Sequence, residues 1–68
     1  MRDVNRIYPF CEKLAYYWKT YYSELRFGQF MMCLFSWIEK EYKVTDVFFI
    51  EEDKMLEYLK AFCERGDK

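Results

Sequence analysis

The chain has 68 residues, enough for one small domain and too few for two, because a chain of this size buries only about 60% of its unfolded surface. Hydrophobic residues make up 53% of it and charged residues 34%, which is typical of a globular domain and excludes a disordered one. The net charge of -1 provides no basic field for nucleic acid, so we do not expect nucleic acid as the main partner.

The first predicted helix runs from about Val4 or Ile7 to Tyr22. Pro9 is tolerated only in a first turn, because deeper in a helix it would remove a hydrogen bond. Residues 3–8 should therefore form a looser turn before the firm helix. The inner face is predicted from helical spacing and comprises Ile7, Phe10, Cys11, Leu14, Trp18 and Tyr21.

The second predicted helix runs from about Arg26 to Tyr42. A connection of about two to four residues before it implies that it lies antiparallel to the first helix. Its apolar residues occupy more than one face, so it should be the central helix, covered on several sides or placed at an oligomer seam. Gly28 in its first turn is interpreted as a point of close backbone approach. The main stripe is Phe27, Phe30, Met31, Leu34, Ile38 and Tyr42, whereas Met32, Cys33, Phe35 and Trp37 lie on other faces.

The apolar run at 47–50 is too short and too uniform for an amphipathic helix, and it is predicted to be an extended FFI segment that seals one end of the bundle. Acidic residues at 51–53 then begin a third helix, because they favour the positive end of the helix dipole. Gly66 is its predicted C-cap. The inner stripe is Met55, Leu56, Leu59, Phe62 and Cys63, opposite Lys54, Glu57, Lys60 and Glu64. The predicted fold is all-α, a three-helix bundle forming one domain over residues 1–68.

The aromatic content predicts an interaction surface. Seven Tyr, seven Phe and two Trp give 16 rings, and each ring can bury roughly 150 to 250 Å². So small a core cannot cover them all, and we expect exposed tyrosines to form a contact patch. The same excess of apolar surface predicts a homo-oligomer.

Three cysteines, Cys11, Cys33 and Cys63, are widely spaced, with no CxxC pair and no histidine in the chain. This pattern is typical of buried, reduced thiols in a cytoplasmic protein. Charged residues throughout the first 20 positions argue against a signal peptide or a membrane span. We therefore expect a cytoplasmic protein that does not associate with membranes.

No catalytic residue is predicted. The absence of histidine removes the usual general base and the commonest metal ligand. The acids at 51–53 could hold a divalent cation, but no EF-hand or P-loop spacing accompanies them, and a role at the helix start is favoured. We expect no enzyme, no cofactor and no metal.

Arg26 and Gln29 form a further candidate site. They lie three residues apart on one helix face and could together grip a carboxylate or phosphate. The favoured interpretation is structural, with both residues clasping the acidic turn at 51–53. A binding site that keeps Arg26 free is the alternative.

Short motifs along most of the chain carry a family resemblance. They are Arg2-Asp3, Asn5-Arg6-Ile7, Trp18, LRFGQF at 25–30, FIEED at 49–53 and Met55-Leu56. Together they resemble an uncharacterised family of small bacterial and phage proteins, a domain of unknown function, with RDPxRI, LRxGQ and FYIEDDxLL motifs. Val4 stands where the family has Pro, and Glu52 where it has Asp. The resemblance implies a helical fold without enzymatic activity, and it favours a phage or mobile-element inhibitor that binds a host defence protein of the CRISPR type.

The function predicted from all these features is a non-enzymatic protein-binding module that masks the surface of its partner. Tyr, Trp and Arg are enriched at protein interfaces. Aromatic and basic residues also alternate between positions 13 and 26, so a binder of single-stranded nucleic acid or of a small ligand is the alternative. The predicted partner-binding residues are Tyr16, Tyr17, Tyr22, Arg26, Gln29, Trp37, Glu51, Glu52 and Asp53.

Overall fold

The computed structural model describes residues 3–65, apart from the side chain of Phe48. Its elements are the 3-10 turn η1 (Val4–Arg6), helix α1 (Ile7–Tyr21), helix α2 (Phe27–Tyr42), the 3-10 turn η2 (Val47–Phe49) and helix α3 (Glu52–Cys63). Residues 3–65 contain no strand, so the prediction of an all-α, three-helix bundle is confirmed. The C-cap predicted at Gly66 lies outside the described residues.

The start of α1 follows the predicted pattern. The carboxylate of Asp3 accepts a hydrogen bond from the backbone N–H of Asn5 at 2.9 Å, which caps the loose turn η1. Pro9 then falls in the first turn of α1, where its missing N–H removes no helical hydrogen bond.

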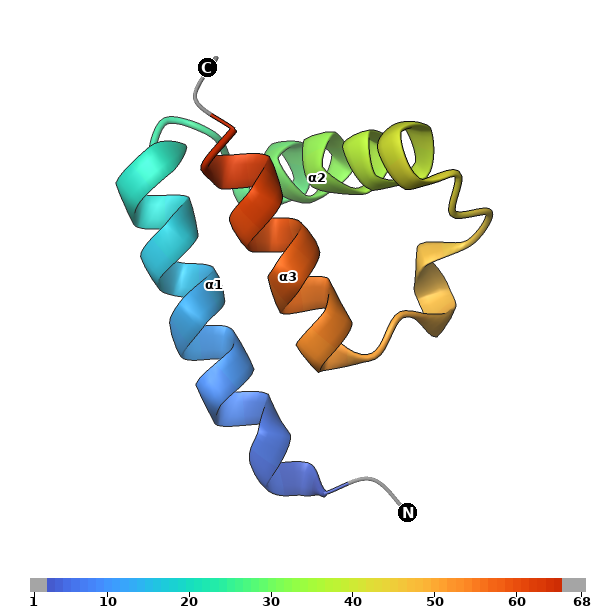
Figure 1. The fold of residues 1–68 in the computed structure, drawn as a ribbon. Coiled ribbons are helices and arrows are strands. Elements are labelled where there is room, and N and C mark those ends of the chain that lie inside the picture. The colour runs from blue at the N-terminus through green and yellow to red at the C-terminus, as the bar shows by residue number, and fades with distance from the viewer. Residues whose placement is uncertain (1–2, 66–68) are drawn as a thin grey trace.

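Helices α1 and α3 lie side by side and run in the same direction (Figure 1). Arg6, just before α1, bonds to Glu52 at the start of α3, and Tyr17 near the end of α1 bonds to Glu64 just after α3. Helix α2 starts near the upper ends of this pair, runs in a different direction and extends away from α1 (Figure 1). The helix that packs against both others is therefore α3, and the predictions of a central α2 and of an antiparallel first pair are wrong.

Trp18 sets the direction in which the chain leaves α1. Its indole N–H donates to the carbonyl oxygen of Leu25 at 2.9 Å. Its ring also packs against Phe27 and Phe30, with centroids 5.8 and 5.9 Å away. These contacts hold the start of α2 against the end of α1, so the remainder of α2 extends away from α1.

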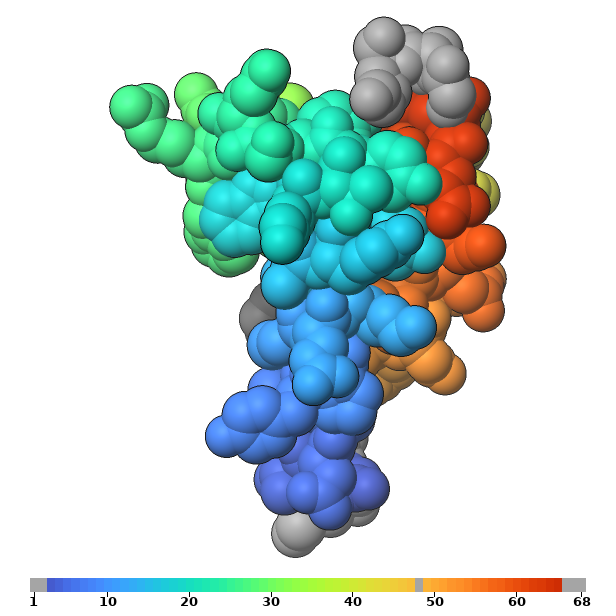
Figure 2. All heavy atoms as spheres, turned by 90° about the vertical axis from the view of Figure 1, so that its left-hand side faces the viewer, coloured from blue at the N-terminus to red at the C-terminus, as the bar shows by residue number. Residues whose placement is uncertain are grey.

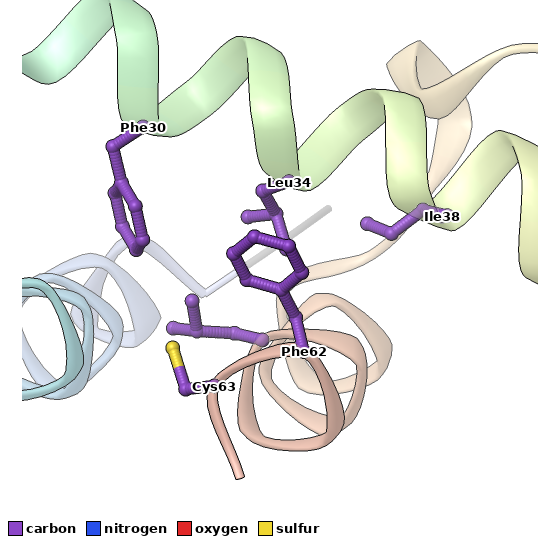
Figure 3. Close-up of a cluster of buried hydrophobic side chains, with 6 residues drawn as sticks. Phe30, Leu34, Ile38, Phe62 and Cys63 are labelled. Atoms are coloured by element: carbon purple, nitrogen blue, oxygen red, sulfur yellow. The ribbon is translucent and has the colours of Figure 1, made fainter. Parts of the chain in front are cut away.

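The core lies between α2 and α3 (Figure 3). Two of the predicted inner stripes meet there. Among the described side chains, the fully buried ones are Phe30, Leu34, Ile38, Leu59, Phe62 and Cys63. Helix α1 contributes no buried residue, and its Leu14, Tyr17, Trp18 and Tyr21 are half-buried against the core. The inner faces predicted for the second and third helices are thus confirmed at these six residues. Phe27 and Tyr42 of the second helix and Ile7 and Cys11 of the first, which were predicted to face inward, are exposed.

The FFI segment is a 3-10 turn and not an extended strand. The N–H of Ile50 donates to the carbonyl of Val47 at 3.1 Å, which closes one turn. Val47 and Ile50 pack against the core, as expected of a segment that seals the bundle, but Phe49 is 75% exposed. A left-handed residue at the end of α2, Lys43 with φ 58°, turns the chain toward this segment.

The outer face of α2 is open in the monomer. Cys33 is exposed, contrary to the prediction of a buried thiol, and Met32 is 70% exposed. A Cβ atom at Gly28 would meet no atom within 4 Å, so the predicted close backbone approach is wrong. Helix α2 meets the other helices on one side only. Apolar residues on its other side, such as Met32, therefore remain exposed.

Candidate protein-binding surface

Three tyrosines of α1 form a continuous row, which we call the tyrosine ladder: Tyr16, Tyr17 and Tyr21. The rings of Tyr16 and Tyr17 meet edge to face at 5.2 Å, and those of Tyr17 and Tyr21 stack at 5.9 Å. Tyr16 is 57% exposed, whereas the other two are half-buried. The ladder therefore presents one open ring supported by two that the fold holds in place.

A groove between α1 and α3 adjoins the ladder. It has a volume of about 230 Å³ and is lined by Lys13, Tyr17, Leu56, Glu57 and Lys60. Its floor is apolar and its edges carry both signs of charge. Figure 2 shows α1 and the orange start of α3 on this side of the molecule.

Glu64 fixes the hydroxyl end of the ladder. The Tyr17 hydroxyl donates to Glu64 Oε2 at 3.4 Å, and Lys60 lies 3.4 Å from the other oxygen of the same carboxylate. Burial raises the pKa of Tyr17, and the negative charge of Glu64 raises that pKa further. The pKa of Tyr21 is raised for the same two reasons. Both hydroxyls therefore stay protonated at neutral pH, and that of Tyr17 acts as a hydrogen-bond donor.

Arg26 and Gln29 do not clasp the acidic turn. The Gln29 side-chain oxygen instead accepts a hydrogen bond from the backbone N–H of Arg26 at 2.8 Å, closing the first turn of α2. Both side chains are exposed. The pair thus has a local capping function, and the prediction of a long-range clasp is wrong.

Arg6 occupies the place predicted for Arg26. Its Nε donates to Glu52 Oε1 at 2.7 Å, joining the starts of α1 and α3. This hydrogen bond is the largest cause of the lowered pKa of Glu52. Glu51 and Asp53 flank the pair, and the four residues line a surface depression of about 340 Å³.

Replacing Arg6 with glutamine should raise the pKa of Glu52 toward its usual value, because the charged hydrogen bond that stabilises the carboxylate is lost. An NMR pH titration of the Glu52 carboxyl group measures this change. Arg26→Gln is the matched control and should leave the Glu52 pKa unchanged. The opposite result, with Arg26→Gln alone raising it, would restore the clasp predicted from the sequence.

The same pair predicts a pH dependence of stability. A carboxyl group whose pKa is lower in the folded state stabilises the fold above its unfolded pKa and loses that effect as pH falls through the folded pKa. Arg6→Gln should therefore be less stable than the wild type at neutral pH, and the two should converge in acid. Urea denaturation of both proteins at neutral and at acidic pH measures the difference in their free energies of unfolding.

Tyr22 and Trp37 belong to the core and not to an open surface. Their rings lie 5.2 and 5.4 Å from that of Phe62, and both are half-buried. The Arg65 guanidinium lies 4.4 Å from the Phe62 ring centroid and covers that cluster from the outside. Of the nine predicted partner-binding residues, the structure therefore brings together only Tyr16 and Tyr17 beside the groove and the three acids beside Arg6.

The sequence interpretation missed the residues that complete the groove. The spacing of Lys13, Tyr17 and Tyr21 places all three on one face of α1, and this signal was present in the chain. Leu56 and Lys60 of α3 could be added only once α3 was known to run parallel to α1.

None of the helices within residues 3–65 has the length and apolar character that crossing a bilayer requires. The described part of the chain also contains no group of three or more His, Cys, Asp or Glu side chains placed to hold a metal ion. Comparison of the sequence and the structure with protein-family models, with curated proteins and with solved structures finds no match.

Proposed function

We propose that this chain is a non-enzymatic protein-binding module that masks a surface of its partner with the tyrosine ladder and the adjoining groove. The observation that carries the proposal is the open ring of Tyr16, 57% exposed and held against Tyr17 at 5.2 Å. Tyrosines in such positions are typical anchors of protein interfaces, since each provides a rigid apolar body and a polar tip.

Preorganisation supports this function. A ring that is already packed in the free protein loses little conformational entropy when a partner covers it. Tyr17 and Tyr21 are fixed from below by the core, and Glu64 fixes the Tyr17 hydroxyl. The ladder can therefore serve as a contact surface without rearrangement.

The charges around the groove favour a protein partner. Lys13 and Lys60 lie at its edge together with Glu57, and Glu64 lies beside the ladder. Mixed charges of this kind match a partner surface that carries both signs, and they orient its approach. A polyanion would meet repulsion from the two carboxylates.

A binder of single-stranded nucleic acid or of a small ligand is the second candidate. The observation in its favour is the stacked pair Tyr17 and Tyr21 with lysines nearby, because stacked rings and positive charge are what single strands bind. Phosphate contacts would make such binding fall steeply with salt, whereas an aromatic protein interface depends on salt only weakly.

The family resemblance gives the order in which partners should be tested. Host defence proteins of the CRISPR type come first, with surface masking as the proposed mode of inhibition. A pull-down from host lysate with the tagged chain, followed by binding measurements on the purified partner, identifies the target.

Replacing Tyr16 with alanine should weaken binding to that partner by at least about tenfold, since anchoring aromatic residues at interfaces contribute on the order of 2 kcal/mol. Calorimetry at low and high salt measures the effect. Met32→Ala, which removes a similarly exposed apolar side chain on α2, is the control and should bind normally. Unchanged binding by Tyr16→Ala, or selective, steeply salt-dependent binding of a single-stranded oligonucleotide, would refute the proposal.

A further inference from the structure

The start of α1 carries an exposed apolar stripe that the proposed function does not use. It consists of Val4, Ile7, Tyr8 and Cys11, which we call the α1 stripe. Val4 is 69%, Ile7 45% and Tyr8 79% exposed, and Cys11 is exposed as well. Steps of three and four residues place these side chains on one side of the helix.

The α1 stripe continues a packed seam. Further along the same face Leu14 and Trp18 contact the core, and Trp18 is covered by Phe27 and Phe30 of α2. Because only the start of α2 lies beside α1, at the far end of α1, the part of the seam that α2 covers stops there (Figure 1). In Figure 2 the blue start of α1 reaches below the orange start of α3. One seam is thus covered in its second half and open in its first.

We propose that the α1 stripe is the seam of a homodimer, in which the start of α1 packs against the start of α1 of a second copy. The line through the seam has the alternating three- and four-residue spacing with which helices pair along their length: Val4, Ile7, Cys11, Leu14 and Trp18, with Tyr8 flanking it. A helix is therefore the element that fits over its open half.

A second copy is the occupant that the charges favour. No member of the stripe is charged, so two identical stripes can meet without opposing like charges, as a two-fold interface requires. The net charge of the chain is -1, so repulsion between whole copies is weak.

The apolar area of the α1 stripe is close to the apolar area that one partner contributes to a standard interface. Val4, Ile7 and Tyr8 are 45 to 79% exposed and Cys11 is exposed as well, so the stripe presents on the order of 300 to 400 Å² of apolar surface, comparable with the largest patch on a typical monomer. A standard interface takes about 800 Å² from each partner, of which about 57% is apolar. The stripe would supply most of that apolar part, and neighbouring polar side chains of α1 would form the rim.

The dimer is independent of the proposed partner surface. Tyr16 and Tyr17 lie on other sides of α1 than the stripe, so the groove stays open when a second copy covers Ile7 and Tyr8. A dimer would carry two tyrosine ladders and could engage two partner molecules, or one partner twice.

Sedimentation equilibrium over a wide concentration range tests the proposal on the full chain. The wild type should show a monomer–dimer equilibrium, and Tyr8→Lys should raise the dimer dissociation constant at least about thirtyfold, because two charges would enter an apolar seam. Met32→Lys places the same charge on an equally open site of α2 and should leave the constant unchanged. Tyr8 is 79% exposed, so its replacement does not disturb the core, and circular dichroism confirms the helix content.

Thiol labelling gives a second readout. In a Cys33→Ser background, labelling of Cys11 should slow as the protein concentration rises through the dimer dissociation constant, since the seam covers this thiol. A strict monomer at all concentrations, or a dimer that Met32→Lys dissociates and Tyr8→Lys does not, overturns the proposal. A monomer in which Tyr8→Lys abolishes partner binding also overturns the dimer and shows that the α1 stripe binds the partner. The effect of Tyr16→Ala on partner binding is measured separately, and it tests whether the tyrosine ladder is part of the binding surface.

Discussion

Replacing Phe62 with alanine should unfold most of the protein or lower its melting temperature by at least about 12 °C. Truncating a buried Phe costs about 3 to 5 kcal/mol, and a domain of 68 residues has a total stability of only about 3 to 10 kcal/mol. For a domain of this size, each kcal/mol of lost stability lowers the melting temperature by roughly 4 to 8 °C. A loss of about 3 to 5 kcal/mol therefore lowers the melting temperature by about 12 to 40 °C.

The expected cost is large because Phe62 joins all parts of the core. It is 2% exposed and contacts Tyr22 from the end of α1 and both Phe30 and Trp37 from α2, with ring centroids 5.2 to 6.3 Å apart. The Arg65 guanidinium rests on the same ring. Alanine would leave a cavity that these rings cannot close without giving up contacts with one another.

Thermal unfolding followed by circular dichroism measures the effect. Phe49→Ala is the matched control, because it removes the same ring from a site that is 75% exposed, and it should lose much less stability than Phe62→Ala. Equal losses from the two substitutions would show that Phe62 is not the centre of the core.

Cys33 should react with a thiol reagent at least about a hundredfold faster than Cys63 in the folded protein. The Cys33 thiol is exposed on α2, whereas that of Cys63 is fully buried. Burial raises the pKa of Cys63 to about 11. A rise of about two pKa units lowers the reactive thiolate fraction roughly a hundredfold at neutral pH, before any limit on access is counted.

The measurement uses a Cys11→Ser variant, so that only two thiols remain. Absorbance with a chromogenic disulfide reagent should show one fast equivalent without denaturant and a second after urea is added. The opposite order would place α2 with its Cys33 face in the core, as the sequence alone suggested. Two fast equivalents would mean that the end of α3 opens readily.

The sequence predicted the helices and most of the core because these depend on local periodicity. In α3 the inner residues recur every three or four positions, and Leu59, Phe62 and Cys63 are buried as predicted. The FFI segment is short and uniformly apolar and lacks such a period, so the sequence predicts an extended segment there. A single 3-10 turn needs only one hydrogen bond from residue 50 to residue 47, and no amphipathic pattern indicates it.

The errors at the candidate site come from the directions of the helices. The acidic turn does bind an arginine, but this is Arg6, which lies 46 positions from Glu52 in the sequence. The sequence favours Arg26 because it shares a helix face with Gln29 and because Gly28 between them is expected to allow a close approach, and neither feature shows which arginine lies next to Glu52. The exposure of Tyr16 could be predicted, because the chain has more aromatic rings than so small a core can cover. The α3 residues that line the groove, Leu56, Glu57 and Lys60, could not be predicted, because their place beside α1 depends on the parallel packing.

The parallel packing of α1 and α3 determines when this chain can fold during synthesis. The hydrogen bonds that join the two helices link residues 46 and 47 positions apart, and α1 has no buried residue of its own. An isolated helix of about 15 residues is marginal in water. While α1 and α2 leave the ribosome, most of the surface of α1 therefore has no partner, and its rings are available to chaperones. The native structure forms only when α3 has emerged, so translation of α3 sets the earliest time at which the domain can act.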